Sequence, residues 1–259
     1  MKALTRLAII PALIILLGVA CSFSAGDTSS SDTSGSSTDQ TVSSPTEAAV
    51  DVPTEDTSSQ DASSQDSSSP TSEPYTTFTF DTEPTDWTYW LQSGNENDVS
   101  FQVDNGKMHV EINGKETYLY FTYDAYTYDN VYIETVVDNR GVNSQSVSLL
   151  CRYSESEGWY EVNVQNDGLY NIFAYDARKK SYDMLTSGGS NAIKQGKEIN
   201  AYGFDCTDRT LTLWINGTKV TEFKENKYQL REGNVGFAIS SYEALPVIVD
   251  VDEVTIDKP

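Results

Sequence analysis

Hydrophobic and polar residues alternate in short segments after about residue 75, and turn residues separate these segments. The stretch 147–175 shows the pattern best, because three alternating runs follow one another there. In its second run, Tyr160, Val162 and Val164 fall on the inward face of a strand. Trp159, Glu161 and Asn163 fall on the opposite face. Such alternation is typical of antiparallel strands with one face buried in the core and one face exposed to solvent. The stretch therefore predicts a three-stranded antiparallel meander.

The same pattern predicts strands through the rest of this region and no long helix. Asp104-Asn105-Gly106 and Asn216-Gly217 carry the strongest hairpin signals. A turn-rich loop is expected around Trp87 and Trp90, and a change of apolar phase near Asp252 predicts a β-bulge. We expect an all-β sandwich, or jelly roll, of two antiparallel sheets. The expected strands are 75–81, 99–103, 107–112, 118–123, 131–137, 147–153, 159–164, 169–175, 181–185, 198–205, 211–215, 219–223, 235–239 and 247–256.

The first residues form a targeting segment. Lys2 and Arg6 precede an apolar run, 7–19, that is too short for a comfortable membrane span. The run ends in Leu-Gly-Val-Ala-Cys, which resembles the lipobox of bacterial lipoproteins. The segment 1–21 therefore predicts a lipoprotein signal peptide, with a membrane anchor carried by the thiol of Cys21. The alternative is an ordinary secretory leader that is cleaved nearby.

A second compositional segment, 22–74, is rich in Ser, Thr and Asp and contains no Lys or Arg. It is too polar to offset the entropy of ordering, so we expect a disordered linker. The linker would hold a folded domain, 75–259, away from the bilayer on the outer side of a bacterial cell envelope. The net charge of −22 makes nucleic acid an unfavourable partner, because both would be negative.

Two cysteines remain after the leader, Cys151 and Cys206, and each falls on an apolar strand face. Exported proteins meet oxidising conditions, so two such thiols predict a disulfide. The alternative is a pair of buried free thiols.

Six short motifs stand out along the predicted strands and turns, namely Leu150-Cys151-Arg152-Tyr153, Gly158-Trp159-Tyr160, Asn166-Asp167-Gly168, Asp205-Cys206, Leu211-Thr212-Leu213-Trp214-Ile215-Asn216-Gly217 and Gly233-Asn234-Val235-Gly236. Together they resemble concanavalin A-like jelly-roll domains, in particular the laminin-G-like or glucanase-like domains of bacterial lipoproteins. The resemblance covers about 75–257 and implies the same sandwich. It does not decide the function, because that superfamily includes lectins, carbohydrate-binding modules, protein-binding modules and glycoside hydrolases.

Few residues offer catalytic or metal chemistry. Laminarinase-type relatives carry Glu-x-Asp-x-x-Glu on one strand, as retaining hydrolysis requires, and this chain has no such motif. His109 is the only histidine, which excludes zinc sites with several histidines, and we expect it at the surface. No cofactor is expected, although Asp81 and Asp252 could hold a structural Ca²⁺ if the first and last strands pair.

Aromatic residues supply the remaining candidates for a ligand site. Sugar rings stack their C–H faces on aromatic rings, while amides and carboxylates bind the hydroxyls. The sequence thus favours a surface-anchored, non-catalytic carbohydrate-binding module with a polysaccharide partner. The alternatives are a protein-interaction or structural module of the envelope, and a glycoside hydrolase-like enzyme. The candidate ligand-binding residues are Trp87, Trp90, Tyr118, Tyr120, Trp159 and Trp214.

Overall fold

The computed structural model describes residues 74–259. The expected signal peptide with Cys21, and the expected linker up to residue 73, lie outside the described residues. The described part consists of fifteen β-strands and one short 3₁₀ helix, η1 (Glu96–Asp98). Within it, no helix is long and apolar enough to cross a lipid bilayer.

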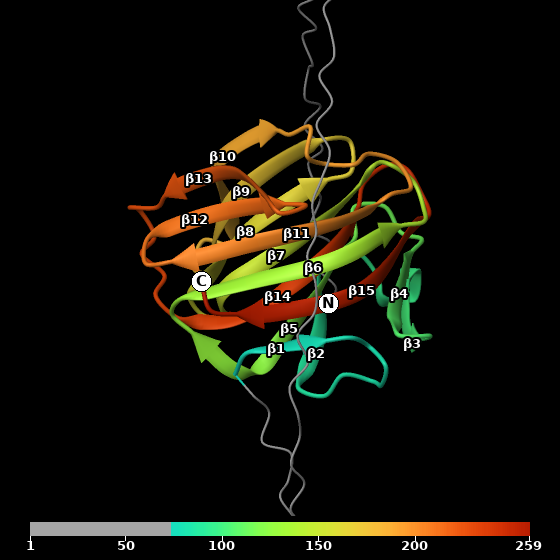
Figure 1. Cartoon of the computed structure of the whole chain (residues 1–259), viewed down its shortest axis with the longest axis horizontal. Coiled ribbons are helices and arrows are strands. Elements are labelled where there is room, and N and C mark those ends of the chain that lie inside the picture. The colour runs from blue at the N-terminus through green and yellow to red at the C-terminus, as the bar shows by residue number, and fades with distance from the viewer. Residues whose placement is uncertain (1–73) are drawn as a thin grey trace, which may run out of the picture. The chain divides into compact units, whose positions relative to one another are not determined.

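The strands form two antiparallel sheets that lie one in front of the other (Figure 1). Sheet A contains β1 (Thr76–Phe78), β3 (Val99–Asp104), β4 (Lys107–Ile112), β6 (Val131–Asn139), β11 (Ile199–Thr207), β12 (Thr210–Ile215), β13 (Thr218–Lys224) and β15 (Val247–Asp257). Sheet B contains β2 (Trp87–Ser93), β5 (Tyr118–Tyr128), β7 (Gln145–Ser154), β8 (Gly158–Gln165), β9 (Leu169–Asp176), β10 (Ser181–Gly189) and β14 (Gly233–Ser241). The order in sheet A is β13-β12-β11-β6-β15-β4-β3, with β1 also on β15, and the order in sheet B is β10-β9-β8-β7-β14-β5-β2.

The core lies between the sheets and is built from alternate residues of each strand. Leu149, Val162 and Phe237 point inward from sheet B, and Phe204 and Leu213 point inward from sheet A; none is more than 1% exposed. Each side chain of this kind contributes roughly 1.5–3 kcal/mol when it is fully buried. The apolar rows of the sequence are thus the inside of a sandwich, as the alternation predicted.

The predicted turns and the predicted bulge are confirmed. Asn105 and Gly106 have φ of 52° and 73° between β3 and β4, and Asn216 and Gly217 have 50° and 73° between β12 and β13. Two successive residues with positive φ make the type I′ turns that suit the twist of hairpins. The register of β15 against β6 shifts between Val251 and Glu253, at the expected bulge.

The expected loop around Trp87 and Trp90 is wrong. These residues belong to β2, which pairs with β5 at the edge of sheet B. Trp87 packs on the core side, whereas Trp90 packs against rings on the outer side. The strand therefore has aromatic residues on both faces and shows no alternation of apolar and polar residues.

The two sheets are also joined covalently. A disulfide links Cys151 of β7 to Cys206 of β11, 55 residues further along the chain. The predicted pairing is confirmed, because both side chains point from their sheets into the shared core.

Candidate functional site

A hollow on the outer face of sheet B results from the sizes of its outward residues. Ser146 and Ser148 on β7 lie beside Ser240 and Ala238 on β14, and all four side chains are small. These strands also occupy the middle of the sheet. The outer face of the sheet is therefore depressed at its centre.

Larger side chains on the neighbouring strands form the walls of this hollow. Tyr118 and Tyr120 stand on β5, next to Ser240 and Ala238. On the other side, Phe173 of β9 stands beside the long side chains of β8. The resulting sheet-B cavity has a volume of about 290 Å³ and is lined by Tyr118, Tyr120, Glu161, Asn163, Gln165, Asn171, Phe173, Tyr182, Ser240 and Tyr242.

A buried carboxylate, that of Glu161, lies in the wall of the sheet-B cavity and is only 4% exposed. Its Oε2 accepts hydrogen bonds from Trp159 Nε1 and from the Tyr120 hydroxyl, both at 3.0 Å. Ser148 donates a further hydrogen bond to the carboxylate. Burial raises the pKa of Glu161, and these three donors oppose part of that rise.

The hydrogen-bond chain continues to the edge of the sheet. The Tyr120 and Tyr182 hydroxyls lie 2.9 Å apart. Because Tyr120 gives its hydrogen to Glu161, Tyr182 must donate to Tyr120. Burial and the nearby carboxylate raise the pKa of Tyr120, so both phenols stay protonated at neutral pH. The chain fixes the orientation of three groups that line the cavity.

The outer face of β8 continues with two amides after Glu161. Asn163 uses both hydrogens of Nδ2 on Ser146 and Ser148, at 2.7 and 3.0 Å, so its orientation is fixed. Within the described chain, Gln165 and the neighbouring Asn171 of β9 make no side-chain hydrogen bond. These two amides are therefore available to a ligand, each with donors and an acceptor.

An aromatic cluster closes one side of the sheet-B cavity. Trp159 stacks on Tyr175 with ring centroids 4.0 Å apart, and Trp90 stacks on Tyr120 at 4.3 Å. Tyr153 covers the two tryptophans from a further side. Trp159 is consequently only 3% exposed. The sequence placed it on the correct face, but its ring is covered and its indole N–H holds Glu161.

The other candidate aromatics divide between three places. Tyr118 and Tyr120 line the cavity, and Trp90 supports Tyr120 from the neighbouring strand. Trp87 packs against the core instead, in contact with rings of both sheets. Trp214 lies on β12, in the other sheet, opposite Gly203. The structure thus brings together four of the six predicted residues, Trp90, Tyr118, Tyr120 and Trp159. It separates Trp87 and Trp214 from them.

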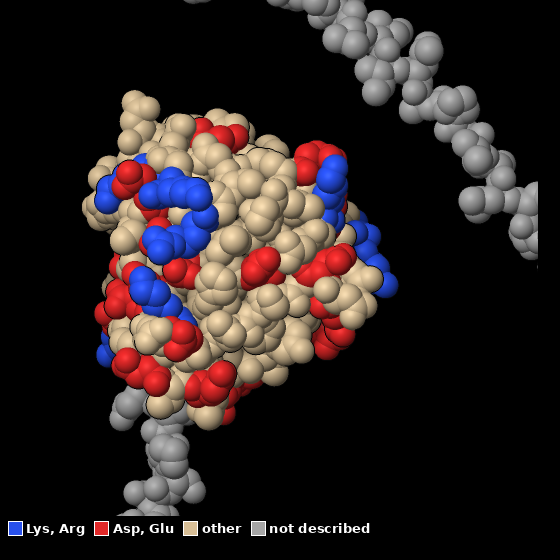
Figure 2. Space-filling view, turned by 90° about the vertical axis from the view of Figure 1, so that its right-hand side faces the viewer, with Lys and Arg blue, Asp and Glu red and all other residues tan. Residues whose placement is uncertain are grey.

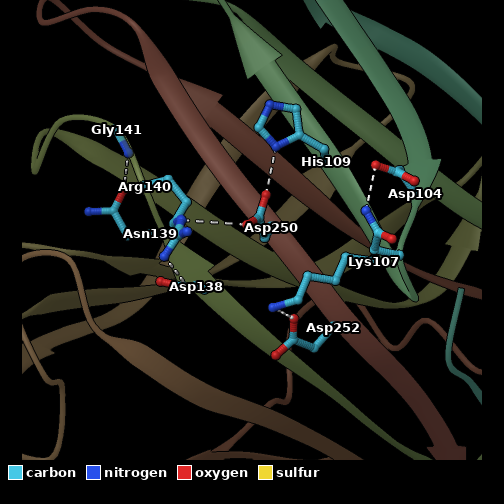
Figure 3. A network of polar contacts seen from close by, with 10 residues as sticks. Asp104, Lys107, His109, Asp138, Asn139, Arg140, Gly141, Asp250 and Asp252 are labelled. Carbon is cyan, nitrogen blue, oxygen red and sulfur yellow. Dashed lines mark hydrogen bonds and ion pairs between the residues drawn. The ribbon is translucent and has the colours of Figure 1, made fainter.

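The outer face of sheet A carries a charge network (Figure 3). His109 Nδ1 lies 2.6 Å from Asp250 Oδ1, and Arg140 Nε lies 3.6 Å from the second oxygen of the same carboxylate. Lys107 Nζ lies 2.7 Å from Asp252 Oδ1. His109 is partly exposed, as expected for a surface histidine, and Asp252 has a lysine as its partner.

The two proposed calcium ligands come from chain segments that do pair. Phe78 of β1 lies opposite Val254 of β15. Asp81, just after β1, accepts a hydrogen bond from Thr79 at 2.7 Å. Among residues 74–259, no three His, Cys, Asp or Glu side chains form a group that could hold a metal ion.

Several cavity residues were missed from the sequence, namely Glu161, Asn163, Gln165, Asn171 and Phe173. A usable signal was present in β14, whose sequence Gly-Asn-Val-Gly-Phe-Ala-Ile-Ser-Ser puts large residues inward and small residues outward. A strand with small outward residues in the middle of a sheet predicts a depression there.

Other hollows of the domain differ in chemistry. One, of about 730 Å³, shares Trp90 with the aromatic cluster but is lined by four carboxylates, those of Asp124, Glu155, Glu157 and Glu232. Two more, of about 620 and 480 Å³, are lined mainly by charged and polar loop residues. Figure 2 shows another side of the domain, where acidic side chains are scattered and basic ones lie toward both the left and the right edges of the view. Small-molecule sites are typically apolar with a few convergent polar groups, and the sheet-B cavity fits that description best.

Comparison with known proteins shows the fold. No protein-family model and no curated protein matches the chain. A protein of unknown function with a galectin-like fold from Bacillus subtilis matches with a TM-score of 0.55 and 10% identity, over 71% of this chain and 94% of that one. The β-glucanase of Bacillus licheniformis gives 0.51 and 12%, over 71% and 98%. The carbohydrate-binding module CBM66 from Bacillus subtilis gives 0.50 and 11%, over 67% and 96%.

These similarities confirm the predicted concanavalin A-like jelly roll. At about 10% identity, these similarities show the fold and not the function. The similar structures include both a binding module and enzymes.

Proposed function

We propose that this domain is a non-catalytic carbohydrate-binding module that takes sugar rings of a polysaccharide in the sheet-B cavity. The observation that carries the proposal is that one cavity combines aromatic walls with two amides, Gln165 and Asn171, that make no side-chain hydrogen bond within the described part of the chain. Tyr118 and Phe173 offer ring surface to the C–H face of a sugar, and the amides suit its neighbouring hydroxyls. The volume of about 290 Å³ is at the low end for small-molecule sites, which suits about one or two rings of a longer chain.

The arrangement of acidic groups supports binding without hydrolysis. Glycoside hydrolases usually need two carboxyl groups on either side of the scissile bond. Of the described residues, Glu161 alone brings a carboxylate to the cavity lining, and the next outward positions of β8 are the amides Asn163 and Gln165. An amide can neither donate a proton as an acid nor act as a carboxylate nucleophile.

The domain's geometry also fits attachment through a lipid on Cys21 at the outer side of a bacterial envelope. The described chain begins at Pro74, whose carbonyl accepts a hydrogen bond from Tyr128. Gly233 of β14 pairs with Tyr128, and Ser240 pairs with Tyr118 in the cavity wall. At about 3.3 Å per residue, Gly233 and Ser240 lie roughly 23 Å apart along β14, so Pro74 is bound near the end of the strand that is distant from the cavity. In the proposed arrangement, an anchor upstream of Pro74 would therefore leave the cavity accessible to a polysaccharide.

Calorimetric titration of the full chain with a panel of soluble polysaccharide fragments tests the function. We expect saturable binding to at least one glycan and no release of reducing ends during long incubation. Changing Gln165→Ala should weaken binding about tenfold, since one lost hydrogen bond is worth about 1 kcal/mol or slightly more.

Gln102→Ala is the matched control, because Gln102 is an exposed glutamine on sheet A. It should leave the affinity unchanged. Absence of binding to every glycan would contradict the proposal, and release of reducing ends would contradict its non-catalytic part.

A further inference from the structure

We propose that Glu161 makes the sheet-B cavity selective for uncharged sugars, so that it rejects sugars bearing a carboxylate, such as uronates. This inference rests on the proposed function and specifies its ligand class. It starts from the position of Glu161, which lies in the cavity wall although it is almost fully buried.

The carboxylate of Glu161 cannot turn away from a ligand. Trp159 and Tyr120 hold its Oε2 at 3.0 Å each, and Tyr120 is itself fixed by its stacking on Trp90. The three donors to Glu161 are neutral groups. They orient the carboxylate without neutralising it, so above the pKa of Glu161 a second carboxylate in the cavity would meet an unpaired negative charge away from bulk water.

Among residues 74–259, no basic side chain lines the cavity to compensate for a ligand's charge. Tyr118 directs its hydroxyl to Glu116 at 2.7 Å, which adds a second acid near the rim. Lys115, the base nearest to that wall in the sequence, is paired with Glu243 at 2.7 Å. An acidic sugar would therefore find the carboxylates of Glu161 and Glu116 at or near the cavity and, among the described residues that line it, no cation.

The polar groups that remain for recognition are uncharged. Gln165 and Asn171 each combine donors with an acceptor, which matches a hydroxyl that also donates and accepts. Tight carboxylate recognition generally uses Arg or Lys, or clustered backbone N–H groups. The lining provides no such side chain, and its open groups suit hydroxyls.

The test compares matched pairs of oligosaccharides that share linkage and length but differ at one carbon, a CH₂OH group or a carboxylate. Gluco- and glucurono-, manno- and mannurono-, and galacto- and galacturono-oligosaccharides provide such pairs. We expect the full chain to bind the uncharged member of a pair at least about 100-fold more tightly. The reason is the repulsion between two carboxylates at contact distance in a cavity partly shielded from water. Methyl esterification of the acidic member should restore most of its affinity.

Glu161→Gln removes the charge and keeps an acceptor for Trp159 and Tyr120. It should reduce the ratio of affinities to below about tenfold, whereas Glu116→Gln at the rim should change the ratio by less than about threefold, as expected for an exposed charge. Esterification tests the same repulsion from the ligand side, so the result does not depend on whether the Glu161 variant folds.

The outcomes separate this inference from the function on which it rests. Equal binding of both members of a pair, or tighter binding of the acidic one, would overturn the selectivity and leave the proposed function standing. An esterified ligand that stays as weak as the acid would also overturn it. If no member of any pair binds, the proposed function fails, and the selectivity fails with it.

Discussion

Replacing Tyr120 with phenylalanine isolates the hydrogen bond that holds the buried carboxylate of the cavity. The change removes one oxygen and keeps the ring that stacks on Trp90 at 4.3 Å. It deletes the 3.0 Å hydrogen bond to Glu161 and the 2.9 Å contact with the Tyr182 hydroxyl. Because Tyr182 is 39% exposed, water can replace its lost partner.

The expected loss of stability comes almost entirely from the carboxylate. A hydrogen bond to a charged group contributes about 1.5–3 kcal/mol, so Tyr120→Phe should lower the free energy of unfolding by about 2 kcal/mol near neutral pH. With a denaturant slope of about 2 kcal/mol per molar urea, the unfolding midpoint falls by about 1 M. Tyr182→Phe is the matched control, since it deletes a hydroxyl one step further from the carboxylate, and it should cost less than about 1 kcal/mol.

The pH dependence of this loss identifies Glu161 as its source. Burial raises the pKa of Glu161 in the folded state, so its contribution favours folding below the unfolded pKa of about 4.3 and is lost as pH rises through the folded pKa. The Tyr120 hydroxyl lowers that pKa, and its removal therefore raises the pKa further. The loss should be larger near pH 8 than near pH 4, because the ionised fraction of Glu161 rises with pH.

Urea unfolding followed by tryptophan fluorescence at both pH values measures this difference. An equal loss at the two pH values would refute the assignment of the hydrogen bond to an ionised Glu161. A loss below about 0.5 kcal/mol near pH 8 would refute the estimated strength.

Two further predictions concern the frame of the sandwich. Replacing both Cys151 and Cys206 with alanine should lower the free energy of unfolding by about 4 kcal/mol, because the bond closes a loop of 55 residues, and urea titration of the oxidised wild type and the variant measures the loss. Arg152 donates from Nε to the carbonyl of Asp129 at 2.9 Å and from Nη1 to that of Leu230 at 2.8 Å. Arg152→Met should therefore lower the melting temperature by roughly 6–12 °C, a loss of about 3 kcal/mol, and Arg152→Lys should recover less than half of this fall because one ammonium cannot reproduce the planar fork.

Much of the fold was readable from the sequence because local features repeat. Each alternating run reports its own inward face, and the turn at Asn105-Gly106 reports its own hairpin. The partnership of Cys151 with Cys206 followed from the same face assignments. The edge strand at Trp87 was the exception, because it packs rings on both faces.

The site was harder to predict because it depends on register between strands that are distant in sequence. Glu161 meets Tyr120 only because β8, β7, β14 and β5 pair in one register across the sheet. The outward direction of Trp159 was correct, but its burial depends on Tyr175 and Trp90 from other strands. Alternation assigns a residue to a face of the sheet, and it does not show which neighbours will cover that face.

A crystal structure of the chain with a bound glycan tests the central claim most directly. The account predicts an uncharged sugar ring in the sheet-B cavity, against Tyr118 or Phe173, with a hydroxyl bonded to the amide of Gln165 or Asn171. A glycan bound on sheet A beside Trp214, or in the charged loop hollows with the sheet-B cavity left empty, would contradict it.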